Sequence, residues 1–218
     1  AETQEETSEE VVLASAQTAK QLVRDFVKEG DRVLVLGVGG GAVIRLLQEC
    51  VRPSQIIGVE LDATHLYIAR RFFGVTPRRA ELVEADARDW LRNYTGPPFD
   101  LIIDDLFGHS GGEAERTVGL DGDWLSLLSG NLSAHGVLAI NFFEARALRE
   151  AGRLLRTASP GKFAAAFSLS LPGYENRVGV FRSPAAVGKS LRQMLRATDS
   201  PCGIRLAGLP YQVRRLNP

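Results

Sequence analysis

The chain has 218 residues, of which 44% are hydrophobic, so it can bury the core of one α/β domain. Its 26 basic and 26 acidic side chains cancel, which removes the net charge expected of a protein that lives on nucleic acid or on an anionic membrane. The two cysteines are too few and too far apart for a disulfide framework or a four-ligand zinc site. No run approaches the roughly 18 apolar residues of a membrane span, and the start has no signal-peptide pattern. We therefore expect a cytoplasmic protein without metal, nucleic acid or membrane partners.

The apolar residues of 8–28 recur at helical spacing after an acidic start, and Gly30 follows as a stop signal, so an amphipathic helix is expected there. Strands and helices then alternate. We expect strands at 32–36, 55–60, 81–84, 99–104 and 136–142, and helices at 41–51, 62–73, 86–93, near 113–129 and at 144–157, with a glycine-rich loop after 104. The strands expected at 163–169 and 177–181 are joined by a loop too short for a crossover helix, so they should pair antiparallel. We expect a helix at 185–197 and then an irregular, proline-bounded end.

This order predicts an α/β fold with a doubly wound sheet that is seven-stranded and mostly parallel, with one antiparallel strand near its edge and helices on both faces. We expect three parts: an acidic tail and amphipathic helix at 1–30, a ligand-binding domain at 31–182, and a basic extension at 183–218. In such sheets, ligands bind beyond the carboxyl ends of the strands. That rule selects the loops after Leu36, around Glu60, around Asp86 and after Asp104.

A glycine-rich turn follows the first expected strand in VLVLGVGGGAVIRLL. Gly37, Gly39 and Gly41 would let the backbone come within contact distance of a ligand, although a tight turn without a ligand would use them as well. Glu60, at the end of the next strand, can accept hydrogen bonds from both hydroxyls of a ribose, whether of NAD or of an adenosyl cofactor. Asp86, just past the third strand, can accept from an adenine amine and can also cap the next helix. NAD sites ordinarily require no acid there, so the pattern favours an adenosyl cofactor.

Five motifs in order, LGVGGG, GVELD, EADA, FDLIIDD and LSAHGVLAINF, resemble those of class I S-adenosylmethionine-dependent methyltransferases, and more narrowly those of the spermidine synthase branch of that fold and its methyltransferase-like relatives. The resemblance covers about 31–143. It implies a Rossmann-like methyltransferase fold that binds S-adenosylmethionine or its decarboxylated form. By this resemblance, the cofactor-binding residues are Gly37, Gly39 and Gly41 at the methionine and ribose part, Glu60 and Leu61 at the ribose, and Asp86 and Ala87 at the adenine. We place Asp104 with them, although bonding of local backbone is the role we favour for its side chain.

In aminopropyltransferases, the loop after the fourth strand has the form D-S-x-D-P, and its first acid helps to deprotonate the attacking amine. Asp105 aligns with that acid and is our first candidate for a catalytic base, with His109 on the same loop as the second. The second acid of the pattern falls on Gly108 and its Pro on His109. Gly40 stands where the glycine turn of that family keeps an acid, and the first 30 residues do not resemble the family's N-terminal β-hairpin domain. These departures weigh against polyamine synthesis.

Substrate-side residues are expected at the end of the fifth strand and in the late hairpin turn, namely Asn141, Glu144, Tyr174, Glu175 and Asn176. Trp124 is expected in the core or facing a partner. The leading hypothesis is an S-adenosylmethionine-dependent transferase, a spermidine synthase-like methyltransferase that acts on a small-molecule amine or a protein acceptor. The alternatives are a polyamine aminopropyltransferase using decarboxylated S-adenosylmethionine, a non-catalytic nucleoside-binding module, and an NAD-dependent oxidoreductase. A homodimer is one assembly that we consider.

Overall fold

The computed structural model describes residues 29–50, 52–110, 113–170, 172, 176–183 and 212–216. The helices expected at 8–28 and 185–197 lie outside these residues. Within the described ranges, no helix has both the length and the apolar character needed to cross a membrane.

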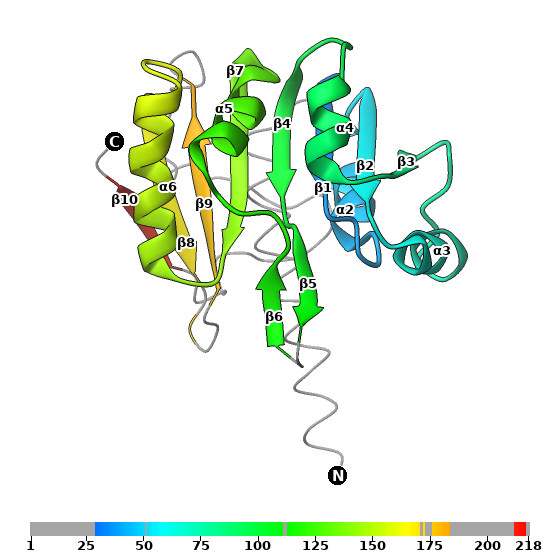
Figure 1. Ribbon diagram of the computed structural model, residues 1–218. Coiled ribbons are helices and arrows are strands. Elements are labelled where there is room, and N and C mark those ends of the chain that lie inside the picture. Colours follow the sequence, from blue (N-terminus) through cyan, green and yellow to red (C-terminus); the bar gives the residue numbers. More distant parts are fainter. Residues whose placement is uncertain are drawn as a thin grey trace.

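One eight-stranded sheet forms the centre of the molecule, in the order β10-β8-β9-β7-β4-β1-β2-β3 (Figure 1). Its strands are β1 (Arg32–Leu36), β2 (Gln55–Glu60), β3 (Glu81–Glu84), β4 (Phe99–Asp104), β7 (Leu132–Phe142), β8 (Ala165–Ser170), β9 (Arg177–Arg182) and β10 (Gln212–Leu216). The neighbours from β3 to β7 pair parallel. The predicted antiparallel pairing of the two late strands is confirmed, since β9 runs antiparallel to both β8 and β7. The sheet has one strand more than predicted, because 212–216 is not irregular but pairs antiparallel with β8.

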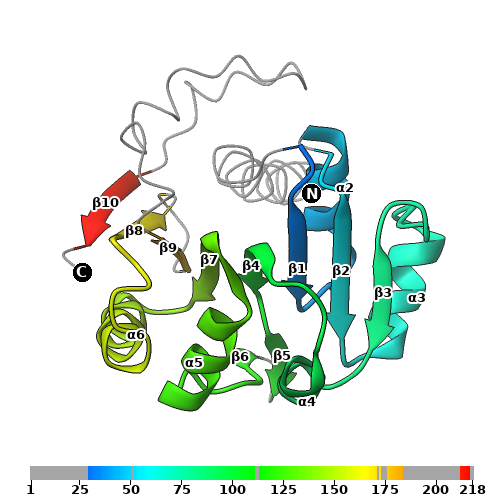
Figure 2. The same ribbon diagram turned by 90° about the horizontal axis from the view of Figure 1, so that it is seen from above.

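Helices cover both faces of this sheet. The side chains of β1 point alternately to the two faces and are apolar on both, so each face must be buried. Leu34 and Leu36 join a buried cluster with α4, α5 and α6, whereas Val33 and Val35 join a second cluster with α2 and α3. The helices are α2 (Ala42–Cys50), α3 (Ala63–Arg71), α4 (Ala87–Asn93), α5 (Gly122–Gly130) and α6 (Ala145–Ala158). Seen from above, α4, α5 and α6 follow one another along the same face (Figure 2). The predicted doubly wound architecture is therefore confirmed.

The segment after β4 departs furthest from the sequence prediction. In place of a glycine-rich loop and a helix from about 113, β5 (Phe107–Ser110) and β6 (Glu113–Arg116) form an antiparallel hairpin. This hairpin projects beyond the carboxyl ends of the parallel strands (Figure 1). The helix α5 begins later than predicted, where the Asp121 carboxylate accepts from the Trp124 backbone N–H at 2.7 Å. The chain therefore forms a hairpin between β4 and α5, where the sequence predicted a loop and the first part of a helix.

Candidate functional site

A cavity of about 680 Å³ lies beyond the carboxyl ends of β1, β2, β3 and β4. Its volume falls within the range of small-molecule sites, which is roughly 300–1,000 Å³. Its walls include Gly37, Gly39, Glu60, Leu61, Asp86, Ala87 and Asp105 among the predicted residues, together with Gly40, Phe107, Gly108, Thr117 and Val118. The cavity therefore lies at the edge of the sheet that the sequence predicted, and most of the predicted cofactor residues line it.

The glycines of the turn have different reasons to be glycine. All three predicted ones have positive φ, at 84° for Gly37, 51° for Gly39 and 79° for Gly41, which disfavours any side chain. A Cβ on Gly37 would come within 2.2 Å of the Asp105 carbonyl oxygen, and one on Gly41 within 2.6 Å of Val75 Cγ2. Gly39, by contrast, has open space around it. Gly41 does not line the cavity, and its lack of a Cβ lets the turn pack on Val75. Its role at the cofactor stays a prediction.

The Glu60 carboxylate holds the turn in place. Its Oε2 accepts from the backbone N–H groups of Val38 and Gly39 at 2.9 and 3.0 Å, and its Oε1 accepts from the N–H of Asp62 at 3.1 Å. The side chain is only 11% exposed, and His65 Nδ1 lies 3.6 Å from Oε1. A carboxylate oxygen can accept more than one hydrogen bond, so the predicted ribose role remains compatible with this geometry. The tie between Glu60 and the turn was not foreseen from the sequence.

Asp86 stands at the start of α4, where its Oδ1 accepts from the Asp89 backbone N–H at 3.0 Å. The predicted cap is therefore present. Asp86 is exposed to the cavity, and no hydrogen bond to its Oδ2 is found within the described residues. Beside it, Leu61 is 65% exposed and Ala87 is buried, so apolar surface flanks a free carboxylate oxygen. This combination suits a flat aromatic ring that carries an amine.

Asp104 does not face the cavity, which corrects its assignment to the cofactor. Its side chain has no exposed surface, and Arg116 Nη2 donates to both of its oxygens, at 2.7 and 2.9 Å. The indole N–H of Trp124 donates to Oδ2 at 2.9 Å, and the backbone N–H of Leu106 approaches Oδ1 at 3.4 Å. A buried carboxylate requires such compensation, so Asp104 acts as a structural anchor below the site.

Asp105 lines the cavity just beyond β4, and its carboxylate is hydrogen-bonded to Asn141 of β7. Asn141 Nδ2 donates to Asp105 Oδ1 at 2.9 Å, and Asn176 Nδ2 approaches Asn141 Oδ1 at 3.4 Å. Burial raises the pKa of Asp105, and the neighbouring Asp104 raises it further, while the Asn141 hydrogen bond and Arg116 oppose them. Asn141 thus acts behind the candidate base and does not itself line the cavity.

Four predicted residues gain no support from the described structure. His109 pairs with Ala114 in the hairpin, but its side chain lies outside the described part of the chain. Tyr174 and Glu175 also fall outside it, so all three roles stay predictions. Glu144 stands exposed at the start of α6 with no side-chain capping bond and does not line the cavity, so the structure does not bring it to the site.

Arg116 and Trp124 are the residues that sequence reasoning missed. Arg116 fell inside an expected helix, and Trp124 was expected only as a packing residue, whereas both donate to Asp104. An isolated arginine between a glycine-rich segment and an aspartate-capped helix gives no signal of a partner 12 residues earlier. The signal that could have indicated a partner is Asp104 itself, because an acid at the end of a buried strand needs a cation or several hydrogen-bond donors.

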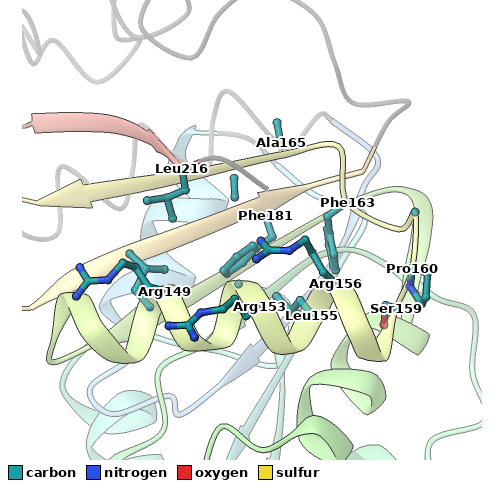
Figure 3. A pocket seen from close by; sticks show the side chains of 14 residues that line it. Arg149, Arg153, Leu155, Arg156, Ser159, Pro160, Phe163, Ala165, Phe181 and Leu216 are labelled. Carbon is teal, nitrogen blue, oxygen red and sulfur yellow. The ribbon is translucent and has the colours of Figure 1, made fainter.

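A second cavity, of about 540 Å³, lies between α6 and the β8–β10 edge of the sheet (Figure 3). Its floor includes Leu155, Phe163 and Phe181, and the side chains of Arg149 and Arg153 stand along α6. It contains none of the residues predicted for the site and no carboxylate. The first cavity holds the predicted carboxylates, so it is the candidate site.

Comparisons with known proteins give the same fold. No protein-family model matches the chain. Human methyltransferase-like protein 13 in complex with SAH superposes with a TM-score of 0.61 at 20% identity, over 84% of this chain and 86% of that one. A probable spermidine synthase from Corynebacterium glutamicum gives a TM-score of 0.62 at 16% identity, over 84% and 66% of the two chains. The molecule therefore has the class I S-adenosylmethionine-dependent methyltransferase fold.

The relatives by sequence are more specific. Polyamine aminopropyltransferase 2 of Caldanaerobacter subterraneus subsp. tengcongensis is 33% identical over 93 residues, which are 41% of this chain and 31% of that protein. The mouse eEF1A lysine and N-terminal methyltransferase is 32% identical over 78 residues, 34% of this chain and 11% of that one. The chain thus spans less than a third of the length of either relative. These relatives confirm the predicted resemblance to the spermidine synthase branch and its methyltransferase-like relatives.

Proposed function

We propose that this chain transfers a methyl group from S-adenosylmethionine to an amine, with Asp105 as the general base. One observation carries the proposal: a single cavity presents the free oxygen of Asp86, the carboxylate of Glu60 and the partly buried carboxylate of Asp105 at the carboxyl ends of β3, β2 and β4. The first two suit an adenine and a ribose, and the third stands where an acceptor would have to lose a proton.

The cavity fits an adenosyl cofactor by its own features. A Cβ at Gly39 would enter open space, Glu60 has accepting capacity beside it, and Leu61 offers an exposed apolar surface. When bound, the cofactor supplies an electrophilic carbon attached to a sulfonium. Transfer from a sulfonium neutralises a cation, so the protein's task is to position the acceptor and exclude water, which can contribute roughly 7–11 kcal/mol.

Asp105 is suited to take the proton of the acceptor amine. Asn141 holds its Oδ1 at 2.9 Å, and within the described residues no hydrogen bond to its Oδ2 is found. The raised pKa that burial gives this carboxyl makes its ionised form a stronger base than an exposed aspartate. A base of higher pKa shares the proton more evenly with an amine, which favours transfer.

Methyl transfer is favoured over aminopropyl transfer because Gly108 and Gly40 stand where the aminopropyltransferase pattern has acids. A Cβ at Gly108 would lie 2.7 Å from Thr117 Cγ2, and one at Gly40 would lie 3.2 Å from the ring of Phe73. Neither position has room for an aspartate without movement of a neighbour. Asp104 is ion-paired with Arg116, so of these two neighbouring acids Asp105 is the one that can balance a cationic acceptor in the cavity. An acceptor with one amine near the reacting centre fits this charge better than a polyamine.

Aminopropyl transfer is the second candidate, because the names of several relatives by sequence state that activity. The two are separated by supplying S-adenosylmethionine or its decarboxylated form together with putrescine, a monoamine or a lysine-containing peptide. Mass spectrometry of the products should show a methylated monoamine or peptide and no spermidine. Formation of spermidine from the decarboxylated cofactor and putrescine would overturn methyl transfer in favour of the second candidate.

A further inference from the structure

The β5–β6 hairpin forms one wall of the cofactor cavity but has few ties to the sheet. Phe107 and Gly108 of β5, and Thr117 and Val118 just after β6, line the cavity. The hairpin forms a two-stranded sheet of its own, and a two-stranded ribbon is marginally stable in water by itself. Its position over the cavity therefore depends on side chains that reach back to the main sheet.

Arg116, the last residue of β6, makes the most such contacts. Its Nη2 donates to both oxygens of Asp104 at the end of β4, at 2.7 and 2.9 Å. Its Nη1 donates to the carbonyl oxygen of Asn141 in β7 at 2.9 Å. Its Nε donates to the carbonyl of Val118 at 3.2 Å, and its guanidinium carbon lies 5.5 Å from the centre of the Phe107 ring. One side chain thus joins the hairpin to two strands of the main sheet.

These contacts converge on the candidate base. Asp104 precedes Asp105 in the chain, and Asn141, whose carbonyl Arg116 holds, donates its side-chain amide to Asp105 at 2.9 Å. The Arg116 side chain is only 14% exposed, so solvent weakens these bonds little. We propose that Arg116 is a positioning residue that fixes the β5–β6 hairpin and Asp105 together as one wall of the cavity.

The effect of Arg116 on the reaction rate rests on the proposed function, whereas its effect on the position of the hairpin does not. Arg116 places a positive charge near Asp105 and opposes the effects of burial and of Asp104 on its pKa. Among the described residues, Asp104 and Arg116 are the charged groups that act on Asp105. The positive charge of Arg116 and its planar set of N–H donors, here called the fork, can be removed separately. A lysine keeps the charge but cannot donate along several directions from one planar group.

The test compares Arg116→Gln, which loses both properties, with Arg116→Lys, which loses only the fork. Arg45→Gln is the matched control, since Arg45 pairs with Glu49 at 3.8 Å on the exposed side of α2. Hydrogen exchange of the amides of 107–110 and 116–118 needs no ligand. Exchange should become about tenfold faster or more in both Arg116 variants and stay unchanged in the control. Unchanged exchange in a folded Arg116 variant would overturn the tether, and the Lys variant serves if the Gln variant does not fold.

The pH dependence of kcat/KM tests the link to Asp105. The acid limb should move to higher pH in the Gln variant, because removal of the positive charge raises the pKa of Asp105 further, and it should stay near that of the unmodified protein in the Lys variant. The control should not move. Coinciding limbs in the Gln and Lys variants would overturn the effect on Asp105. If the unmodified protein binds no adenosyl cofactor, the proposed function fails, while the exchange result still decides the tether.

Discussion

The two sides of the cavity are built by different kinds of contact. On the turn side, which comprises 37–41, Glu60 and Asp86, the residues lie at or just beyond strand ends, and the Glu60 carboxylate bonds to the backbone N–H groups of the turn. On the hairpin side, which comprises Asp104, Asp105, 107–118 and Asn141, the main bonds join one side chain to another: Arg116 to Asp104, Trp124 to Asp104, and Asn141 to Asp105. The turn side therefore needs only glycines and an acid at strand ends, which the sequence pattern shows, whereas the hairpin side depends on side-chain pairs that the pattern does not show.

This difference suggests a division of labour. In the proposed function, the turn side offers backbone and carboxylate oxygens to a ribose and an adenine, while the hairpin side holds the candidate base. Gly37 joins the two sides, since its N–H donates to the Val59 carbonyl at 2.9 Å and its α-carbon packs against the backbone of Asp105. Changes on each side should therefore affect different steps, and a change at Gly37 should affect both.

Replacement of the base should have the largest effect. Asp105→Asn keeps the shape and one hydrogen-bonding oxygen but cannot accept the proton, so kcat/KM should fall by about 10²–10⁴-fold. Binding of S-adenosylmethionine, measured by calorimetry, should change by less than about twofold, since the turn side is intact. Glu144→Gln is the control, because that exposed acid lies away from the cavity. A loss of cofactor affinity as large as the loss of rate would contradict the division of labour.

Substitution at the junction should be next in size. Gly37→Ala would place a Cβ 2.2 Å from the Asp105 carbonyl oxygen at a φ of 84°, so the free energy of unfolding should fall by about 3 kcal/mol or more. Gly30→Ala is the matched control: its φ is 93°, but no atom lies within 4 Å, so only backbone strain of about 1–2 kcal/mol is expected.

Urea denaturation of both glycine variants measures this difference. Equal losses at the two glycines would mean that Gly37 is needed for its backbone conformation alone, and that the turn and the hairpin side are not packed against each other.

The turn side can be weakened by itself through Glu60. In Glu60→Gln, one oxygen that accepts from a backbone N–H is replaced by an amide NH₂, so the bonds to Val38 and Gly39 or the bond to Asp62 must be lost. Affinity for S-adenosylmethionine should fall by about tenfold, with kcat at saturating cofactor nearly unchanged. Glu84→Gln, at the exposed end of β3, provides the control. A fall in kcat with unchanged affinity would place Glu60 in the chemistry instead.

The smallest effect concerns stability and pH. Because burial raises the pKa of Asp105 in the folded state, the folded protein binds more protons at this group than the unfolded chain, and its contribution to stability is lost as the pH rises through the raised pKa. Asp105→Asn removes this penalty, so the variant should be at least as stable as the unmodified protein at pH 7. That advantage should disappear below the ordinary aspartate pKa of about 4.

Thermal unfolding of both proteins across this pH range provides the measurement. The quantity compared is the stability of Asp105→Asn minus that of the unmodified protein. If this difference were lower at pH 7 than in acid, the Asp105 carboxylate would be stabilised by its partners more than it is disfavoured by burial.

The same comparison explains what the sequence could predict. Strand ends, glycine turns and helix caps are local, so Gly37, Glu60, Asp86 and Asp105 were placed at one edge from pattern and spacing. The packing of Gly41 could not be predicted, because spacing does not say whether a missing Cβ makes room for a ligand or for Val75. The hairpin was missed because its short strands carry glycine and charged residues, and the partner of Asp104 could not be inferred without the fold.

Calorimetric titration with S-adenosylmethionine, its decarboxylated form and methylthioadenosine tests the central claim most directly. The claim is that the cavity beyond β1–β4 is an adenosyl-cofactor site. The account predicts saturable one-to-one binding of S-adenosylmethionine that weakens about tenfold in Glu60→Gln and persists in Asp105→Asn. Absence of binding of all three compounds to the folded protein would contradict it.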